Sequence, residues 1–319
     1  MAGGILTDRK DGALAYAIRR ANFPDVIQFY APGIKRYSTE DFEQKTPQAF
    51  RPVSLTGSAC ALNCDHCNTK ILDPMIPLRQ EEGLFKLCQR LAERGTKGIL
   101  ISGGSQHSGA VPLLKYTDDM ARVKAELGLK VMVHCGVPDE KTCAALKAAE
   151  VDGVMLDIIG ANETIREVYH LNITVTDFER GLENLVKHGL SVRPHIILGL
   201  HYGKFLGEYA ALEMIQKYPV HALILVILTP LRGTPMENVA PTAVPLIRDF
   251  FESARIEMPD RPIMVGCSRP GGEHKRAVDQ AAVDCGLNGI AYPAEGIVGY
   301  AKEKGLQPRF YEHSCSCGC

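Results

Sequence analysis

The sequence predicts an α/β protein with a (β/α)8-like barrel of the TIM type, and three observations support this fold class. From residue 50 onward, short β-rich runs alternate with amphipathic runs of helical length, which is typical of a parallel sheet covered by helices. Eight such pairs follow one another, the number that builds a barrel. The 319 residues are 45% hydrophobic, enough for a full core, and no repeat or low-complexity linker divides them. We therefore expect an N-terminal extension at 1–49, one barrel domain at 50–305 and a C-terminal cysteine-rich tail at 306–319.

The elements follow from the apolar pattern in chain order. The extension holds one expected helix at 12–22 and a short apolar piece at 25–30, and we expect it to pack on the outside or the bottom of the barrel. Expected strands lie at residues 53–56, 98–102, 130–134, 153–157, 191–198, 222–228, 263–266 and 289–291. Expected helices lie at residues 80–94, 113–127, 139–149, 177–188, 207–217, 244–255, 274–285 and 296–304. In such a barrel, the loops after the strands build the active site.

The composition of the chain limits which binding partners and which cellular compartment we expect. The formal net charge is −1 without a basic stripe, which argues against nucleic acid as the main partner. No apolar run reaches the ~18 residues that a membrane span requires, so we expect no membrane contact. The N-terminal residues include acidic and basic side chains and lack the apolar core of a signal peptide. We therefore expect a cytoplasmic protein. In that reducing compartment, eleven cysteines, an odd number, favour metal or cluster ligation over disulfides.

Three cysteines with the spacing C-x3-C-x2-C follow the first expected strand: Cys60, Cys64 and Cys67. Three thiolates can fill three iron corners of a cubane cluster, and soft sulfur ligands suit either an iron–sulfur cluster or zinc. A structural zinc site closes with four ligands, and no second pair follows nearby. The next cysteine, Cys88, sits in a helical pattern and is expected to be a core thiol. The triplet therefore predicts a cluster with one iron left open.

A C-x3-C-x2-C triplet directly after the first barrel strand resembles the radical S-adenosylmethionine (radical SAM) superfamily. The resemblance implies a radical SAM barrel with a 4Fe–4S cluster on Cys60, Cys64 and Cys67. It also implies S-adenosylmethionine on the open iron, through its amino and carboxylate groups. The residue before the third cysteine is usually aromatic and lies near the adenine in that family. Here it is His66, whose flat ring suits that place.

Further cofactor contacts are implied by the same resemblance. The segment after the second strand resembles the glycine-rich motif that receives the methionine ammonium, with serine in place of the usual acidic residue. The residue at the end of the fourth strand resembles the polar group that lies near the ribose of S-adenosylmethionine in that family. The end of the fifth resembles a Gly-Leu-Gly-Glu motif in which Tyr202 replaces the glutamate. The residues concerned are Gly103, Gly104, Ser105, Asp157 and Gly199.

The C-terminal half resembles the biotin synthase branch of the superfamily. Residues 228–235, 254–259 and 267–273 carry this likeness, which covers residues 50–301 altogether. Biotin synthases hold a second cluster inside the barrel on cysteines from the second, third and fifth strands. Here the second and fifth strands contain no cysteine, and only Cys135 lies near a matching place. The interior second cluster, and with it biotin synthesis, is therefore not expected. For Arg232 and Arg269 we expect either carboxylate or phosphate binding or plain surface charges.

Near the C-terminus, Cys315, Cys317 and Cys319 alternate with small residues, and two interpretations stay open. One is a flexible tail or an adventitious metal site. The other is a ligand set for an auxiliary iron–sulfur cluster, because Ser316 and Gly318 let the backbone bend around it. Residues expected to complete such a set are Cys267, Cys285, His313 or a group of a partner.

An auxiliary cluster beside a radical generator would be a source of sulfur. A biotin-synthase-like body with extra cysteines is similar to the two-component lipoyl synthases, and this resemblance implies a sulfurtransferase. Its substrate would be an octanoyl chain on a lipoyl carrier protein or domain. Its partners would be a second radical SAM subunit and an electron donor such as ferredoxin or flavodoxin. Two alternatives remain: a rearrangement or maturase enzyme of the same branch, or a non-catalytic iron–sulfur subunit, for which Ser105 and Tyr202 leave room.

Overall fold

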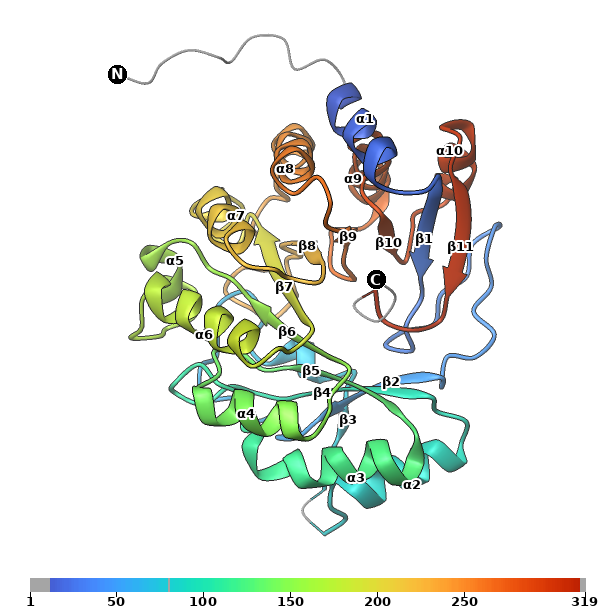
Figure 1. Cartoon of the computed structure of the whole chain (residues 1–319). Coiled ribbons are helices and arrows are strands. Elements are labelled where there is room, and N and C mark those ends of the chain that lie inside the picture. The colour runs from blue at the N-terminus through green and yellow to red at the C-terminus, as the bar shows by residue number, and fades with distance from the viewer. Residues whose placement is uncertain (1–11, 80, 316–319) are drawn as a thin grey trace.

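One curled sheet of parallel strands organises the protein, whose computed structural model describes residues 12–79 and 81–315 (Figure 1). The strands in this part of the chain are β1 Val26–Tyr30, β2 Phe50–Ser54, β3 Ile76–Pro77, β4 Gly98–Ser102, β5 Lys130–His134, β6 Gly153–Asp157, β7 Val192–Leu198, β8 Leu223–Ile227, β9 Ile263–Val265, β10 Gly289–Ala291 and β11 Gln307–Tyr311. Their order is β11-β1-β10-β9-β8-β7-β6-β5-β4-β2-β3. The predicted α/β class is confirmed, in the form of a half-barrel whose sheet stays open between β11 and β3.

Helices cover the convex side of the sheet (Figure 1). They are α1 Ala13–Asn22, α2 Leu84–Glu93, α3 Thr117–Leu127, α4 Glu140–Ala148, α5 Asn162–Glu167, α6 Val175–Lys187, α7 Glu208–Gln216, α8 Val244–Glu257, α9 Gly272–Asp284 and α10 Ile297–Glu303. Short 3-10 helices lie at Lys70–Leu72 and Leu114–Tyr116. All eight strands expected after residue 50 are present as β2 and β4 to β10. All eight helices expected between them are present too, while α5 is additional. In the described residues, no helix combines the length and the apolar character needed to cross a membrane.

The sequence explains where the helices begin. In α6, Thr174 and Asp177 form a capping box, in which each side chain accepts a hydrogen bond from the backbone N–H of the other residue. Phe178, Leu182 and Leu185 then recur at helical spacing on the buried face. Each such side chain contributes about 1.5–3 kcal/mol when it is fully buried, so α6 is held on the sheet mainly by this face.

The segment before residue 50 departs from its expected place. We expected it on the outside or the bottom of the barrel, but β1 lies inside the sheet, paired in parallel with β10 on one side and β11 on the other. Its Ile27 and Phe29 are buried in the main core. Helix α1 packs on α8 and α9 in the outer layer. Strand β11 likewise places residues 307–311 of the expected tail in the sheet.

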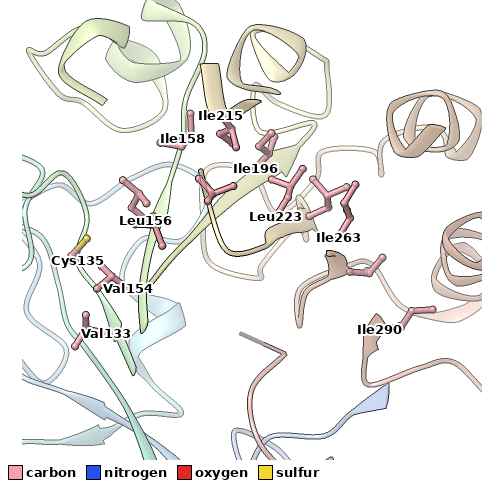
Figure 2. Close-up of a cluster of buried hydrophobic side chains, with 14 of the residues drawn as sticks. Val133, Cys135, Val154, Leu156, Ile158, Ile196, Ile215, Leu223, Ile263 and Ile290 are labelled. Atoms are coloured by element: carbon pink, nitrogen blue, oxygen red, sulfur yellow. The ribbon is translucent and has the colours of Figure 1, made fainter. Parts of the chain in front are cut away.

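Alternation along the strands separates a structural face from a chemical face. Val133 of β5, and Val154 and Leu156 of β6, point into the core beneath the helices (Figure 2), and Val131 belongs to the same core cluster. The residues between them point to the concave side. There, near the amino ends of the strands, Phe50, Met132 and Met155 form a separate apolar cluster with Leu100. Polar side chains follow at the carboxyl ends. The concave side therefore has a closed apolar floor and a polar rim.

Cys135 belongs to the structural face. Its thiol is buried in the core beneath the helices, where Figure 2 shows it beside Val133 and Val154. Its Sγ lies 3.3 Å from the carbonyl oxygen of Met155. The place expected for an interior cluster ligand is therefore taken by a core cysteine. The expectation that Cys88 is a core thiol is confirmed, since it is fully buried in α2.

Candidate active site

The cysteine triplet lies in the loop that follows β2, at the carboxyl edge of the sheet. Cys60, Cys64 and Cys67 all line one cavity. The Cys60 thiol donates to the carbonyl oxygen of Ser105 at 3.8 Å, and Cys64 Sγ lies 3.8 Å from the carbonyl oxygen of Tyr169. Cys64 also donates a hydrogen bond to Cys67. The structure thus gathers the three predicted thiols around a common space.

A tight turn brings the second and third cysteines together. Asn63 and Asn68 have φ values of 48° and 40°, a left-handed conformation that asparagine tolerates better than most residues. The N–H groups of Cys67 and Asn68 both donate to the Cys64 carbonyl oxygen, at 3.1 and 2.8 Å. The hydrogen bond from Cys64, together with one from His66, lowers the pKa of Cys67 below that of an ordinary thiol. Cys67 is therefore poised as a thiolate, the form of cysteine that binds a metal.

The glycine-rich segment after β4 packs directly against the triplet loop. A Cβ atom at Gly104 would lie 2.0 Å from the Ala59 carbonyl oxygen and 2.6 Å from Cys60 Cα, so only glycine permits this approach. The Gly104 N–H donates to Thr56 Oγ1 at 2.7 Å. The Ser105 carbonyl oxygen accepts from the N–H of Ala61 at 2.9 Å. Backbone groups of residues 103–105 therefore stand beside the thiols, and all three residues line the cavity.

The cavity has a volume of about 330 Å³ and a mostly apolar wall. Its size is at the lower end of the range for small-molecule sites. Apolar side chains from the triplet loop, from the segment around α5 and α6 and from the loop after β8 contribute to the wall. Six of them are Ile71, Leu72, Met75, Leu171, Phe178 and Leu231.

Asp157 stands at the end of β6 and also lines the cavity. The sheet register pairs Asp157 with His195 of β7, and His134 of β5 lies with Nε2 3.5 Å from Asp157 Oδ1. Tyr169 donates to Asp157 Oδ2 at 3.5 Å. Burial alone would raise the pKa of Asp157, but His134, and more weakly His195 and His66, lower it to about 2. Burial lowers the pKa of His195 to about 4, so a carboxylate faces a neutral imidazole near pH 7.

His66 lines the cavity between the triplet and the Asp157 group. Its ring centroid lies 5.1 Å from that of Tyr169, with the rings tilted by 43°. Its Nδ1 is buried without a hydrogen-bond partner among the described residues. An unpaired buried nitrogen is costly, which points to a ligand group that would complete it.

Sequence reasoning missed the contacts that fix the triplet loop from outside. The Tyr202 hydroxyl donates to Asp65 Oδ2 at 2.5 Å, and His170 Nε2 lies 2.9 Å from Asp65 Oδ1. The first contact raises the pKa of Tyr202 to about 12. Tyr202 occupies the place where the resembling motif has glutamate. Its position after β7 was therefore the signal, but its partner Asp65 could not be read from spacing.

One predicted contact residue lies elsewhere. Gly199, at a φ of 75° just after β7, does not line the cavity, and its Cβ position would fall 1.8 Å from Thr242 Oγ1. Its N–H donates to Glu208 Oε1 at 2.9 Å. The described geometry thus gives Gly199 a turn and a packing contact, and its expected cofactor contact stays a prediction. Arg269 is likewise neither a ligand group nor a surface charge. It is buried, with Nε 2.7 Å from Asp279 Oδ1.

Comparison with known proteins agrees with this geometry. Residues 54–204 match the family model described as the Radical SAM superfamily. These residues form a radical SAM domain. Over 267 residues the chain is 27% identical to a biotin synthase of Chlorobaculum parvum, which covers 76% of this chain and 72% of that protein. A biotin synthase of Acaryochloris marina is 25% identical over 266 residues, covering 77% of this chain and 69% of that protein.

Solved structures share the fold at low identity. Methylornithine synthase superposes with a TM-score of 0.60 at 14% identity, covering 95% of this chain and 91% of that one. The FeFe-hydrogenase maturase from Carboxydothermus hydrogenoformans gives a TM-score of 0.63 at 17% identity, covering 93% and 70%. The matched residues identify a radical SAM domain in this chain, which is similar to biotin synthases over about three quarters of its length, and the radical SAM superfamily uses a 4Fe–4S cluster and S-adenosylmethionine.

Proposed function

We propose that Cys60, Cys64 and Cys67 hold the 4Fe–4S cluster, and that the protein inserts sulfur into a protein-bound octanoyl chain as a lipoyl synthase component. Three thiols around one cavity, one of them with a strongly lowered pKa, fit the soft donor set of such a cluster. Held by these residues, such a cluster would supply the electron for reductive cleavage of the sulfur–C5′ bond of S-adenosylmethionine to methionine and a 5′-deoxyadenosyl radical, which would take a hydrogen atom from the substrate.

The chain's own groups would bind and orient the cofactor. Residues 103–105 line the cavity and the Ser105 carbonyl oxygen stands beside Cys60, so backbone oxygens of this segment would receive the methionine ammonium. The Asp157 carboxylate, ionised because His134 lowers its pKa, would accept hydrogen bonds from the ribose hydroxyls. The buried, unpaired Nδ1 of His66 would meet the adenine. Each of these groups already lines the cavity that the thiols face.

The apolar wall of the cavity is the observation that carries the substrate class. A hydrogen atom taken from an unactivated C–H group requires a site from which water is excluded. Leu72, Met75 and Phe178 provide such a wall beside the thiols. Each buried methylene of an alkyl chain is worth about 0.8 kcal/mol, so an octanoyl chain would gain several kcal/mol on entering. A hydrocarbon substrate matches this wall better than a highly polar one.

The remaining partners follow from the reaction. The octanoyl chain would arrive on a lysine of a lipoyl carrier protein or domain. A cytoplasmic ferredoxin or flavodoxin would supply the electron, and a second radical SAM subunit would share the two sulfur insertions that a lipoyl group requires. The alternative is a rearrangement or maturase reaction within the same branch, which needs neither a carrier domain nor a sulfur source.

The test uses the anaerobically reconstituted, reduced protein with S-adenosylmethionine and an octanoylated lipoyl domain. We expect 5′-deoxyadenosine and a carrier with sulfur added, and neither when the carrier bears an acetyl group. Cys64→Ala should abolish 5′-deoxyadenosine, whereas Cys88→Ala, the matched core cysteine, should not. Absence of 5′-deoxyadenosine under every condition would support the non-catalytic alternative. Formation of 5′-deoxyadenosine without sulfur in the product, even with a second radical SAM subunit present, would favour a rearrangement or maturase.

A further inference from the structure

The auxiliary cluster expected near the C-terminus lies only partly within the described residues. Cys317 and Cys319 lie outside them. Cys315 accepts a hydrogen bond from Cys267, which follows β9. The other residues expected to complete the set are engaged elsewhere: Cys285 is buried in the main core, and the His313 ring packs against Tyr30 and Tyr311. The auxiliary cluster therefore stays a prediction, whereas a different group of metal-binding side chains is fully described.

Three potential metal ligands lie together on the concave side of the sheet. They are His134 at the end of β5, Asp157 at the end of β6 and His195 within β7, on three neighbouring strands. One ligand atom from each residue lies within 4.8 Å of the other two. Under the proposed function only Asp157 would contact the cofactor. The two imidazoles beside it therefore need an explanation of their own.

The spacing of these atoms fits a single divalent ion. Ligand atoms held about 2.1 Å from one ion at tetrahedral angles lie about 3.4 Å apart. His134 Nε2 and Asp157 Oδ1 already lie 3.5 Å apart. The ligand atom of His195 lies within 4.8 Å of both, so it would have to approach by at most about 1.4 Å. Small rotations about the side-chain bonds of histidine provide such a shift.

A backbone hydrogen bond prepares His195 for a metal. Its Nδ1 lies 3.2 Å from the carbonyl oxygen of Arg193. A carbonyl oxygen can only accept, so Nδ1 carries the proton and Nε2 of the neutral ring keeps a lone pair. Histidines that bind metals are held in this way, by a carbonyl or carboxylate group on the other ring nitrogen. The contact therefore orients the ring and fixes the tautomer that a metal requires.

The ligands stand on rigid strands and remain open to the cavity. The side chains that alternate with them, Val133, Leu156 and Ile196, are buried in the core beneath the helices (Figure 2). The side chains of His134 and Asp157 are each 26% exposed, and both line the cavity. An ion can thus reach them from the cavity, and strands fix the ligands more precisely than loops would.

The positive side chain on the same face of β7 points away from the ligands. Arg193 precedes His195 by two residues, and its guanidinium donates to the carbonyl and hydroxyl oxygens of Ser191, at 3.1 and 3.0 Å. A Cβ atom at Gly153, the first residue of β6, would lie 2.2 Å from the same nitrogen. The guanidinium therefore lies at the amino ends of the strands. The ligands lie toward the carboxyl ends, so this charge does not face a cation bound there.

We propose that His134, Asp157 and His195 bind one divalent first-row metal ion whose remaining positions open to the cavity. Two imidazoles and one carboxylate form a donor set typical of such ions. The open positions would take a carbonyl or carboxylate oxygen of the molecule that occupies the cavity. The proposed ribose contact is compatible with the metal. Asp157 would bind the ion through Oδ1 and keep Oδ2, beside the Tyr169 hydroxyl, for the ribose.

Binding of Mn²⁺ tests the site in the anaerobically reconstituted holoenzyme. An oxidised 4Fe–4S cluster is diamagnetic, so the electron paramagnetic resonance (EPR) signal of Mn²⁺ can be read beside it. Mn²⁺ prefers oxygen and imidazole ligands to thiolates, which limits binding to the cysteines. Without S-adenosylmethionine, we expect a single Mn²⁺ per chain. Pulsed EPR should show its coupling to histidine nitrogen.

Variants of the ligands should lose the ion. Loss of an outer partner alone costs about 10–100-fold in metal affinity, so His134→Leu and His195→Leu should each weaken Mn²⁺ binding at least about tenfold. His201→Leu is the matched control. His201 Nε2 lies 3.7 Å from Glu167 Oε2, a similar pair without a third ligand in the described part of the chain. This variant should leave the affinity unchanged, and circular dichroism melting curves show whether each variant is folded.

Three results would overturn the proposal. The first is a folded holoenzyme that binds no Mn²⁺ at millimolar concentration. The second is bound Mn²⁺ without nitrogen coupling, which would indicate surface carboxylates. The third is unchanged affinity in the folded His134→Leu and His195→Leu variants. Should a leucine variant unfold, pulsed EPR of the unmodified holoenzyme still decides. The measurement requires neither an octanoyl carrier nor 5′-deoxyadenosine formation, so it can fail while the proposed function stands, and the reverse also holds.

Discussion

A methyl group added at Gly104 would collide with the backbone that carries Cys60. The new Cβ atom would lie 2.0 Å from the Ala59 carbonyl oxygen and 2.6 Å from Cys60 Cα and Cβ, whereas real Cβ contacts stay above 3.0 Å. The Ala59 oxygen would therefore have to retreat by about 1 Å, and Cys60 would move with it. A displacement of that size in a reacting assembly costs about 10²-fold in rate. We expect Gly104→Ala to reduce 5′-deoxyadenosine formation by about this factor.

The neighbouring glycine provides the matched control. A Cβ atom at Gly103 would lie 3.1 Å from Thr56 Oγ1 and 3.3 Å from Thr56 Cγ2, and a small shift of that one side chain relieves the contact. Gly103→Ala should therefore lose less than about tenfold. Both variants introduce the same methyl group into the same loop, so their difference isolates the approach to Cys60.

The assay is the initial rate of 5′-deoxyadenosine formation by the reduced, reconstituted variants, with iron content and melting temperature measured on the same samples. Overpacking should cost Gly104→Ala about 1–3 kcal/mol of stability, which leaves a folded protein to compare. A Gly104→Ala rate within about threefold of wild type would refute the reasoning. An equal loss in both glycine variants would do the same, because it would show that the approach to Cys60 is not what matters.

Two further predictions concern stability. Burial lowers the pKa of His195 to about 4 against an ordinary 6.5, so the folded state binds fewer protons and the free energy of unfolding should fall by up to about 3 kcal/mol as the pH drops from 6.5 to 4. Urea titrations should show a shallower fall for His195→Gln, and equal slopes would exclude His195 as the cause. Asp279→Asn should cost about 3–5 kcal/mol, because it leaves Arg269 buried without the carboxylate 2.7 Å away. Glu126→Gln, which breaks an exposed ion pair with Arg122, should leave the urea midpoint nearly unchanged. Similar losses in the two variants would contradict a special role for the buried pair.

The sequence predicted the elements well because each one carries its own apolar period. Strands β4 to β10 alternate with helices in chain order, and each strand pairs with its predecessor or successor in that series. Strand β1 has the composition of a strand, but its neighbours β10 and β11 lie more than 250 residues away in the sequence. Nothing local in Val26–Tyr30 specifies those partners. Its place in the sheet depends on tertiary contacts with distant parts of the chain, which the local sequence does not show. For this reason we expected the segment outside the barrel.

The residues of the site likewise differ in whether the local sequence could predict their positions. The triplet was predictable because the spacing of Cys60, Cys64 and Cys67 is itself the geometric requirement of a cluster. His134 and His195 were missed, although a signal existed. In a β-strand, side chains an even number of residues apart point to the same face. Each histidine stands in this relation to a side chain on the concave face, so both point to the face that carries Asp157. The contact between Tyr202 and Asp65 joins two loops, and alternation says nothing about loops.

The meeting of Cys267 and Cys315 follows from side-chain size as well as from topology. Because all strands are parallel, their carboxyl ends share one edge, yet β1 and β10 still separate β11 from β9. The chain after β11 has to cross both strand ends on the concave side to reach Cys267. The small Ala31 and Ala291 belong to the same apolar cluster as Cys315. Larger side chains there would compete with Cys315 for the same volume. The hydrogen bond between Cys267 and Cys315 therefore joins two loops at the strand ends, which is why the cysteine spacing alone could not identify Cys267 as the partner.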